Sequence, residues 1–169
     1  NLLLNNLREL PASIGNLTKL KYLNLDNNLL DEITPAIGSL KNLSVLNMNI
    51  NSIKDTIAPM PKTMEALQDL RVLKWSVETK FDWAAAIKSM SKLPKLAIVD
   101  LGMGDHLMLP ATIGALTQVR NLRLEGRTIR GADKQYAVAL PNSLAELSRL
   151  ESLVLEWENV FLMPTDMSK

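Results

Sequence analysis

Residues 10–30 read LPASIGNLTKLKYLNLDNNLL, and this stretch contains the pattern that the rest of the chain repeats. Leu23 and Leu25 are separated by one residue, so their side chains point to the same side of a short strand. Tyr22, Asn24 and Asp26 point to the other side. The residues that open the predicted strands, at intervals of 23 to 31 residues, are Leu20, Leu43, Leu70, Leu96, Val119 and Leu150. A period of this length predicts a solenoid, in which each unit is stabilised by packing on its neighbours.

The segments between these strands carry apolar residues at a spacing of three. Ile37, Leu40 and Leu43 would therefore lie on one face of a helical turn. Neither a strand nor its return segment can bury its apolar side alone, so stacked units are expected to form a parallel sheet with an apolar core behind it. We predict one α/β domain over residues 1–169, with about seven units when the incomplete first and last are counted.

The repeat is already under way at the first residue and is interrupted at the last. We therefore expect the chain to be an excerpt of a longer protein. The apolar residues that an uncapped first unit would expose are Leu2, Leu7, Leu10, Ile14 and Leu17. Such an end has to be covered by a cap, by an upstream repeat or by self-association with a second molecule.

Residues 10–17 and 109–116 both read Leu-Pro-x-x-Ile-Gly-x-Leu. With the strand pattern, these motifs resemble the leucine-rich repeat family, and in particular its 23-residue subclass of intracellular Ras-binding-type, plant and bacterial members. The resemblance covers essentially the whole chain. It implies a right-handed horseshoe-shaped arc with a concave parallel sheet and short helical or irregular convex segments, and a role in binding protein partners.

Two further columns of the repeat are kept only in part. Asn5, Asn28 and Asn51 occupy a position where a side-chain amide can both donate to and accept from the backbone groups of a turn. Later units have Glu78, Gly104, Arg127 and Glu158 in that column. In the glycine column, Gly15, Gly38 and Gly114 alternate with Glu65, Ser91 and Ala145. We therefore expect the later turns to be less regular than the first ones.

Composition excludes several classes of function. The net charge of +1 argues against a nucleic-acid partner, and the basic residues near the strand starts are expected to form a solvated edge. There is no cysteine, hence no disulfide or thiolate site, and no Cys-rich cap of the kind that the resemblance would imply for secreted animal members. This favours an intracellular protein over a bacterial secreted or surface one. No apolar run is long enough for membrane insertion.

No catalytic constellation is evident in the sequence. His106 is the only histidine, and it lies in a leucine column, where a metal site or a catalytic relay would need partners that the spacing does not supply. We predict no catalytic residue, no metal site and no cofactor, and therefore a chain that is not itself an enzyme.

Three units are longer than the rest, with insertions at residues 55–60, 79–86 and 130–139. Insertions in solenoid repeats fall on one rim, which is often the binding side. Residues 79–90 are rich in helix formers and predict a true helix. Its aromatic residues Phe81 and Trp83 either cover the core or contact a partner, and the sequence leaves both alternatives open.

The outward positions of the predicted strands define the candidate partner-binding surface. It comprises Tyr22, Asn24, Asn47, Ile50, Val72, Lys74, Val77, Ile98, Asp100, Met103, Arg123, Glu125 and Trp157. A polar track from Asn24 to Arg123 is predicted to run between two apolar margins, which either contact a partner or are covered by neighbouring loops. Trp157 is the anchor candidate, because tryptophan is enriched among residues that dominate binding energy.

The leading hypothesis is a non-enzymatic module that binds a protein or peptide through its concave sheet and the rim that carries the insertions. Two alternatives remain at this stage. The chain could be the substrate-recruiting region of a larger enzyme, such as a bacterial effector, or a surface or adhesion scaffold.

Overall fold

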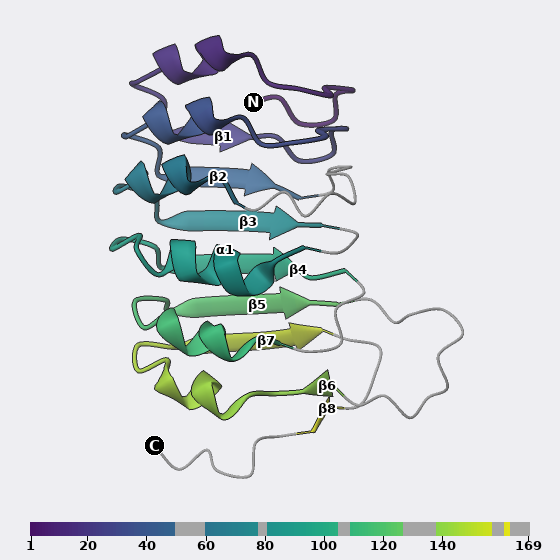
Figure 1. Cartoon of the computed structure of the whole chain (residues 1–169), viewed down its shortest axis with the longest axis vertical. Helices are drawn as coiled ribbons and strands as arrows, with labels where there is room; N and C mark the ends of the chain where they lie inside the picture. Colours follow the sequence, from purple (N-terminus) through teal and green to yellow (C-terminus); the bar gives the residue numbers. More distant parts are fainter. Residues whose placement is uncertain (50–59, 78–80, 105–108, 127–137, 157–160, 163–169) are drawn as a thin grey trace, which may run out of the picture.

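The computed structural model describes residues 1–49, 60–77, 81–104, 109–126, 138–156 and 161–162. Its main sheet has six parallel strands that follow one another in chain order. They are β1 (Tyr22–Asn24), β2 (Val45–Met48), β3 (Val72–Ser76), β4 (Ile98–Gly102), β5 (Asn121–Glu125) and β7 (Ser152–Glu156). A separate parallel pair is formed by β6 (Val138–Ala139) and β8 (Phe161–Leu162). Figure 1 shows the strands of the main sheet stacked along the long axis in chain order. The predicted α/β solenoid is confirmed.

Short helical segments return the chain from each strand to the next. Five are 3₁₀ helices, namely η1 (Ala12–Asn16), η2 (Pro35–Ser39), η3 (Lys62–Ala66), η4 (Ala111–Ala115) and η5 (Asn142–Glu146). Each of these 3₁₀ helices has a proline at its first residue or directly before it, and these prolines are Pro11, Pro35, Pro61, Pro110 and Pro141. Proline suits this position because its φ is already helical and a helix start has no partner for its missing N–H.

The apolar columns of the repeat fill one continuous core. Leu23, Leu46, Leu73, Val99 and Leu122 are paired in register across the sheet, and all five are buried. Leu10 is also buried, so the expectation that it is exposed at the open end was wrong. The reason is that Leu10 packs into the core of its own turn, beneath the next unit.

Glycine brings neighbouring 3₁₀ helices into backbone contact on the convex side. A Cβ at Gly38 would lie 2.2 Å from the carbonyl oxygen of Thr63, a distance that no real side chain tolerates. The same helices are joined by the Thr63 hydroxyl, which donates to the carbonyl of Pro35 at 2.7 Å. Where the column has Glu65 instead, its carboxylate accepts from Ser89 and Lys92 of the next unit. At Glu65 the lost glycine is therefore replaced by a side-chain contact between units.

The helix predicted within residues 79–90 is confirmed as α1 (Trp83–Met90). It begins after Asp82, whose Oδ1 accepts from the backbone N–H of Ala85 at 2.9 Å, which is a standard N-cap contact. The rings of Trp75, Phe81 and Trp83 pack edge to face, with centroids 4.8 to 6.3 Å apart, and all three are buried. The structure therefore decides between the two alternatives: these aromatics cover the core.

Asn28 confirms the expected role of the asparagine column. Its buried Nδ2 donates to the carbonyls of Leu2 and Leu25 at 2.9 Å, and its Oδ1 accepts from the N–H of Leu7 at 3.2 Å. Gly104 fills the column three units later with φ of 56°, a backbone conformation that suits glycine. Asn51, Glu78, Arg127 and Glu158 lie outside the described residues, as do most of the three predicted insertions.

Candidate partner-binding surface

Three rows of outward side chains run across the concave face of the six-stranded sheet. The first row is Tyr22, Val45, Val72, Ile98, Asn121 and Ser152. The central row is Asn24, Asn47, Lys74, Asp100, Arg123 and Val154. The third row is Ser76, Gly102, Glu125 and Glu156. The first two rows take one residue from each of the six strands and the third takes one from each of the last four, so neighbours in a row are about 4.8 Å apart.

The first row forms the apolar margin that the sequence predicts on this side. Tyr22 is 45% exposed and Ile98 is 40% exposed, while Val45 and Val72 are half-buried. The row becomes polar at Asn121 and continues so to the last strand. Its apolar part is therefore confined to β1 through β4.

The second apolar margin was predicted wrongly. Val77 and Met103 are only 4% and 1% exposed, and both belong to the hydrophobic core. Ser76 and Gly102, the last residues of β3 and β4, face outward, so the residue after each of them continues the alternation and points back into the core. Ile50 and Trp157 lie outside the described residues. The described part of this side carries Glu125 and Glu156 instead.

Asn24 and Asn47 lie in the predicted polar track but offer little surface, at 6% and 9% exposure. The Oδ1 of Asn24 accepts from the backbone N–H of Asp26 at 2.8 Å, and its Nδ2 donates to the hydroxyl of Tyr22 at 3.3 Å. Asn24 thus serves the sheet itself more than a ligand.

The rest of the polar track forms a compact charge cluster, which we define as Lys74, Asp100, Arg123, Glu125 and Glu156. The Arg123 guanidinium donates to Asp100 at 3.0 Å, to Glu156 at 2.6 and 3.3 Å, and to Glu125 at 3.2 Å. These hydrogen bonds, to Glu156 first and then to Asp100, raise the pKa of Arg123 above its ordinary value. Lys74 Nζ lies 4.0 Å from the second oxygen of Asp100.

The structure thus brings together four of the predicted site residues and adds Glu156. This residue occupies the outward column of β7, in register with Glu125 of β5. The outward strand position that Glu156 shares with Glu125 was therefore the only sequence signal that could have included Glu156 in the site. A shallow hollow of about 210 Å³ is lined by Lys74, Asp100 and Arg123 of the cluster together with Ile98, Asn121, Ser152 and Val154.

Asp26 lies on the same face beyond the end of β1. Its Oδ1 accepts from the backbone N–H of Asn49 at 2.7 Å. Partial burial raises the pKa of this carboxyl, and the Asn49 hydrogen bond and the charge of Lys74 oppose that shift only in part.

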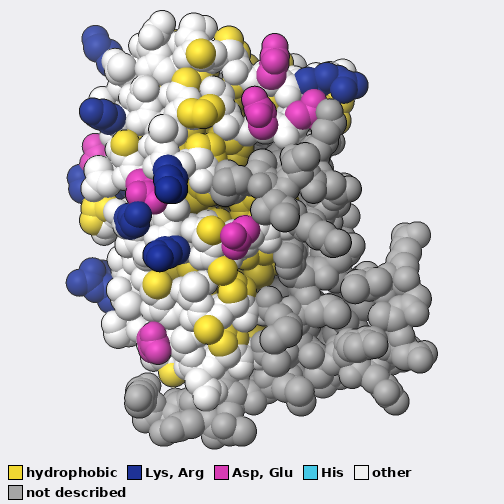
Figure 2. Space-filling model, in the orientation of Figure 1, with side chains coloured by type: hydrophobic (Ala, Val, Ile, Leu, Met, Phe, Trp, Pro, Cys, Tyr) yellow, Lys and Arg dark blue, Asp and Glu magenta, His cyan; other side chains and the backbone are white. Residues whose placement is uncertain are grey.

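Basic side chains lie mainly along another edge. In Figure 2, most Lys and Arg side chains of the visible face lie on the side where the strands of Figure 1 begin. Lys92 pairs with Glu65 at 2.9 Å, and Lys95 and Arg120 pair with Asp69 and Glu151, where the convex helices join the starts of the strands. We define these three pairs as the convex ion pairs. Each of these ion pairs joins one cation to one carboxylate of a neighbouring unit, as expected for a solvated edge.

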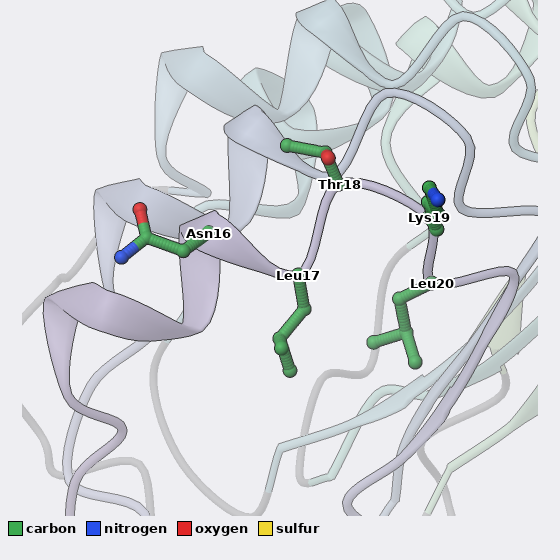
Figure 3. Close-up of a pocket in the computed structure, with 5 residues that line it drawn as sticks. All are labelled: Asn16, Leu17, Thr18, Lys19 and Leu20. Carbon is green, nitrogen blue, oxygen red and sulfur yellow. The ribbon is translucent and has the colours of Figure 1, made fainter.

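A second hollow, of about 480 Å³, lies at the N-terminal end of the stack and is lined by residues 16–20. Figure 3 shows the side chains of Leu17 and Leu20 pointing into the same space below η1. Leu17 is half exposed, as the sequence predicts for this end. The hollow has no charged group other than Lys19 among its lining residues.

Among the described residues, no group of three or more His, Asp or Glu side chains is arranged to hold a metal ion. His106 lies outside them. The helices of the described ranges are all too short or too polar to cross a membrane.

The sequence matches the family described as "Leucine-rich repeat region" over residues 6–167. The chain therefore belongs to the leucine-rich repeat family, which confirms the resemblance. A search of curated protein sequences gives no match.

Solved structures with the same fold come from bacteria and plants. A leucine-rich repeat protein of Leptospira interrogans is 21% identical with a TM-score of 0.66, over 94% of this chain and 36% of that one. Internalin C2 of Listeria monocytogenes is 18% identical with a TM-score of 0.60, over 95% and 67%. The plant peptide hormone receptor RGFR1, solved in complex with RGF2, is 26% identical with a TM-score of 0.57, over 88% and 22%. The chain spans about a third of the Leptospira protein and less of the plant receptor.

Proposed function

We propose that this chain is a non-enzymatic interaction module that binds a protein or peptide partner through the concave face of its main sheet. The observation that carries the proposal is that half-exposed Ile98 lies beside the charge cluster, with half-exposed Tyr22 at the far end of the same row, on one continuous sheet. Apolar contact area next to fixed charges is the usual composition of a protein-binding surface.

The platform is suited to binding because the backbone below it is already fixed. Each strand is hydrogen bonded on its parallel neighbour, and its inward leucines are held in the core. A partner therefore has to order few groups of this chain when it binds, which lowers the entropic cost of association. The plant receptor among the structural neighbours, which was solved in complex with RGF2, supports the assignment by analogy of fold.

The test compares two variants that remove the same charges from different faces. The concave variant carries Lys74→Ala, Asp100→Ala and Arg123→Ala. The matched convex variant carries Lys92→Ala, Asp69→Ala and Arg120→Ala, so each variant loses two cations and one carboxylate. Peptides are selected on the immobilised wild-type chain from a phage-displayed library of random peptides.

We expect the selected peptides to bind the convex variant as tightly as the wild type, and to bind the concave variant with an affinity changed by roughly ten-fold or more, because the charges that they contact are removed. Circular dichroism checks that both variants fold. Peptides that bind both variants equally well would show that the concave face is not the binding surface.

A further inference from the structure

We infer that the partner presents an extended segment with apolar side chains at one end and basic side chains at the other. This inference rests on the proposed function, and it specifies the chemistry of the ligand. Three observations carry it: the charge balance of the concave face, the way Arg123 is bonded, and the order of the rows along the stack.

The concave face is acidic although the chain as a whole is not. Its three rows together with Asp26 hold the carboxylates of Asp26, Asp100, Glu125 and Glu156. Against these stand only Lys74 and Arg123 among the described residues. The whole chain has a net charge of +1, so the negative excess is local to this face. A face with local negative charge attracts a basic partner and repels an acidic one.

The bonding of Arg123 makes this asymmetry sharper. Four of the guanidinium's five N–H donors are directed to carboxylates of the cluster. An acidic partner would have to break these hydrogen bonds and approach three carboxylates. A basic partner leaves Arg123 in place and adds a cation to a site with an excess of carboxylate. The convex ion pairs, with one carboxylate for each cation, show no such excess.

The rows give the segment a direction. On β1 through β4, the first row is apolar and the third row has the small residues Ser76 and Gly102, with Asp26 as the one carboxylate just beyond the end of β1. On β5 and β7, the first row is polar and the third row has Glu125 and Glu156. Six strands at about 4.8 Å span about 24 Å, which an extended chain of about seven residues covers. The apolar end of such a segment fits over β1–β4, and its basic end fits over β5 and β7.

The experiment uses the peptides selected on the wild-type chain. They are sequenced, and representative ones are synthesised with a fluorescent label and titrated by anisotropy. One variant carries Glu125→Gln and Glu156→Gln, and the matched control carries Glu65→Gln and Glu151→Gln on the convex side. Both variants lose two carboxylates and keep the size of the side chains.

We expect the peptides to combine a basic end with an apolar end. The concave Gln variant should bind roughly ten-fold more weakly, the convex Gln variant unchanged, and added salt should weaken wild-type binding. Neutral or acidic peptides that still require Lys74, Asp100 and Arg123 would overturn this inference and leave the proposed function standing. Peptides that are indifferent to the concave triple variant would overturn both.

Discussion

The convex and concave sides of this solenoid are built from the same repeat but use their charged residues differently. On the convex side, Glu65 and Lys92 form a one-to-one pair that joins neighbouring units. On the concave side, Arg123 is shared among three carboxylates from three strands. The comparison teaches that contacts between neighbouring units on the convex side hold the arc together, whereas concave columns that change from unit to unit form a surface with its own charge. Substitutions on the packed side should therefore change stability, and those on the concave face should change binding.

The largest expected effect is on the packed side, at the aromatic contact between β3 and α1. Trp83→Ala should lower the free energy of unfolding by about 3–5 kcal/mol, because it leaves a cavity against Trp75 and Phe81. Trp83→Phe should cost much less, since the indole nitrogen has no hydrogen-bond partner to lose among the described residues. Urea unfolding followed by circular dichroism measures both. Loss of peptide binding by folded Trp83→Ala, with unchanged stability, would place α1 on the binding side.

The asparagine column gives the next largest effect. Asn28→Ala removes the groups that satisfy the N–H of Leu7 and the carbonyl of Leu2, at a cost of about 1–3 kcal/mol. The control is Asn42→Ala, because Asn42 is exposed and makes one hydrogen bond, to the carbonyl of Thr18. Hydrogen exchange should show faster opening of the first turn in Asn28→Ala only. Equal behaviour of the two variants would mean that the column does not hold the turns.

A smaller, pH-dependent effect is expected at Asp26. Because its pKa is raised in the folded state, folding favours the protonated form, so stability falls as pH rises from the ordinary value of 3.8 through the raised one. Asp26→Asn keeps an oxygen that can accept from Asn49 and has no such loss. The difference in unfolding free energy between variant and wild type should therefore grow in favour of the variant as pH rises.

Urea unfolding of both proteins from about pH 3 to pH 7 measures this difference. Glu65 and Asp69 have lowered pKa values, through hydrogen bonds from Lys92 and Lys95, so their stabilisation is lost as pH falls. Their contribution is common to both proteins and cancels. A difference that shrinks with rising pH would show that Asp26 is stabilised as a carboxylate.

The smallest effect on stability is expected in the charge cluster. Glu156→Gln should change the free energy of unfolding by no more than about 0.5 kcal/mol, because the pair with Arg123 is solvent-exposed. The same substitution should weaken binding of a selected basic peptide. A stability loss comparable to that of Asn28→Ala would show that the charge cluster stabilises the fold and does not serve mainly to bind a partner.

Much of the fold could be predicted because the same apolar and polar positions recur in several units of the repeat. The alternation of Leu23 and Leu25 predicted the inward face of the strands, and the Asn28 contacts followed from the needs of a turn. The burial of Val77 and Met103 also agrees with this alternation, since Leu73 and Leu101 are inward and lie an even number of residues away; the wrong prediction placed two consecutive residues on the outward face.

The charge cluster was predicted only in part. Arg123 contacts Glu156 across 33 residues of sequence, and a long unit between β5 and β7 separates them. Column positions place both residues on the concave face, but only the register of the strands brings their atoms within hydrogen-bond distance. Near-burial of Asn24 and Asn47 likewise depends on the side chains of neighbouring strands, which a single column does not describe.

The most direct test of the account is to map the bound peptide on the chain by two-dimensional NMR. A peptide selected on the wild-type chain is titrated into the ¹⁵N-labelled protein, and the shifts of the backbone amides are followed. We predict that the largest shifts occur at Lys74, Asp100 and Arg123 and their neighbours in β3, β4 and β5. Shifts confined to the 3₁₀ helices, or to residues 16–20 at the N-terminal end, with the concave strands unchanged, would contradict the account.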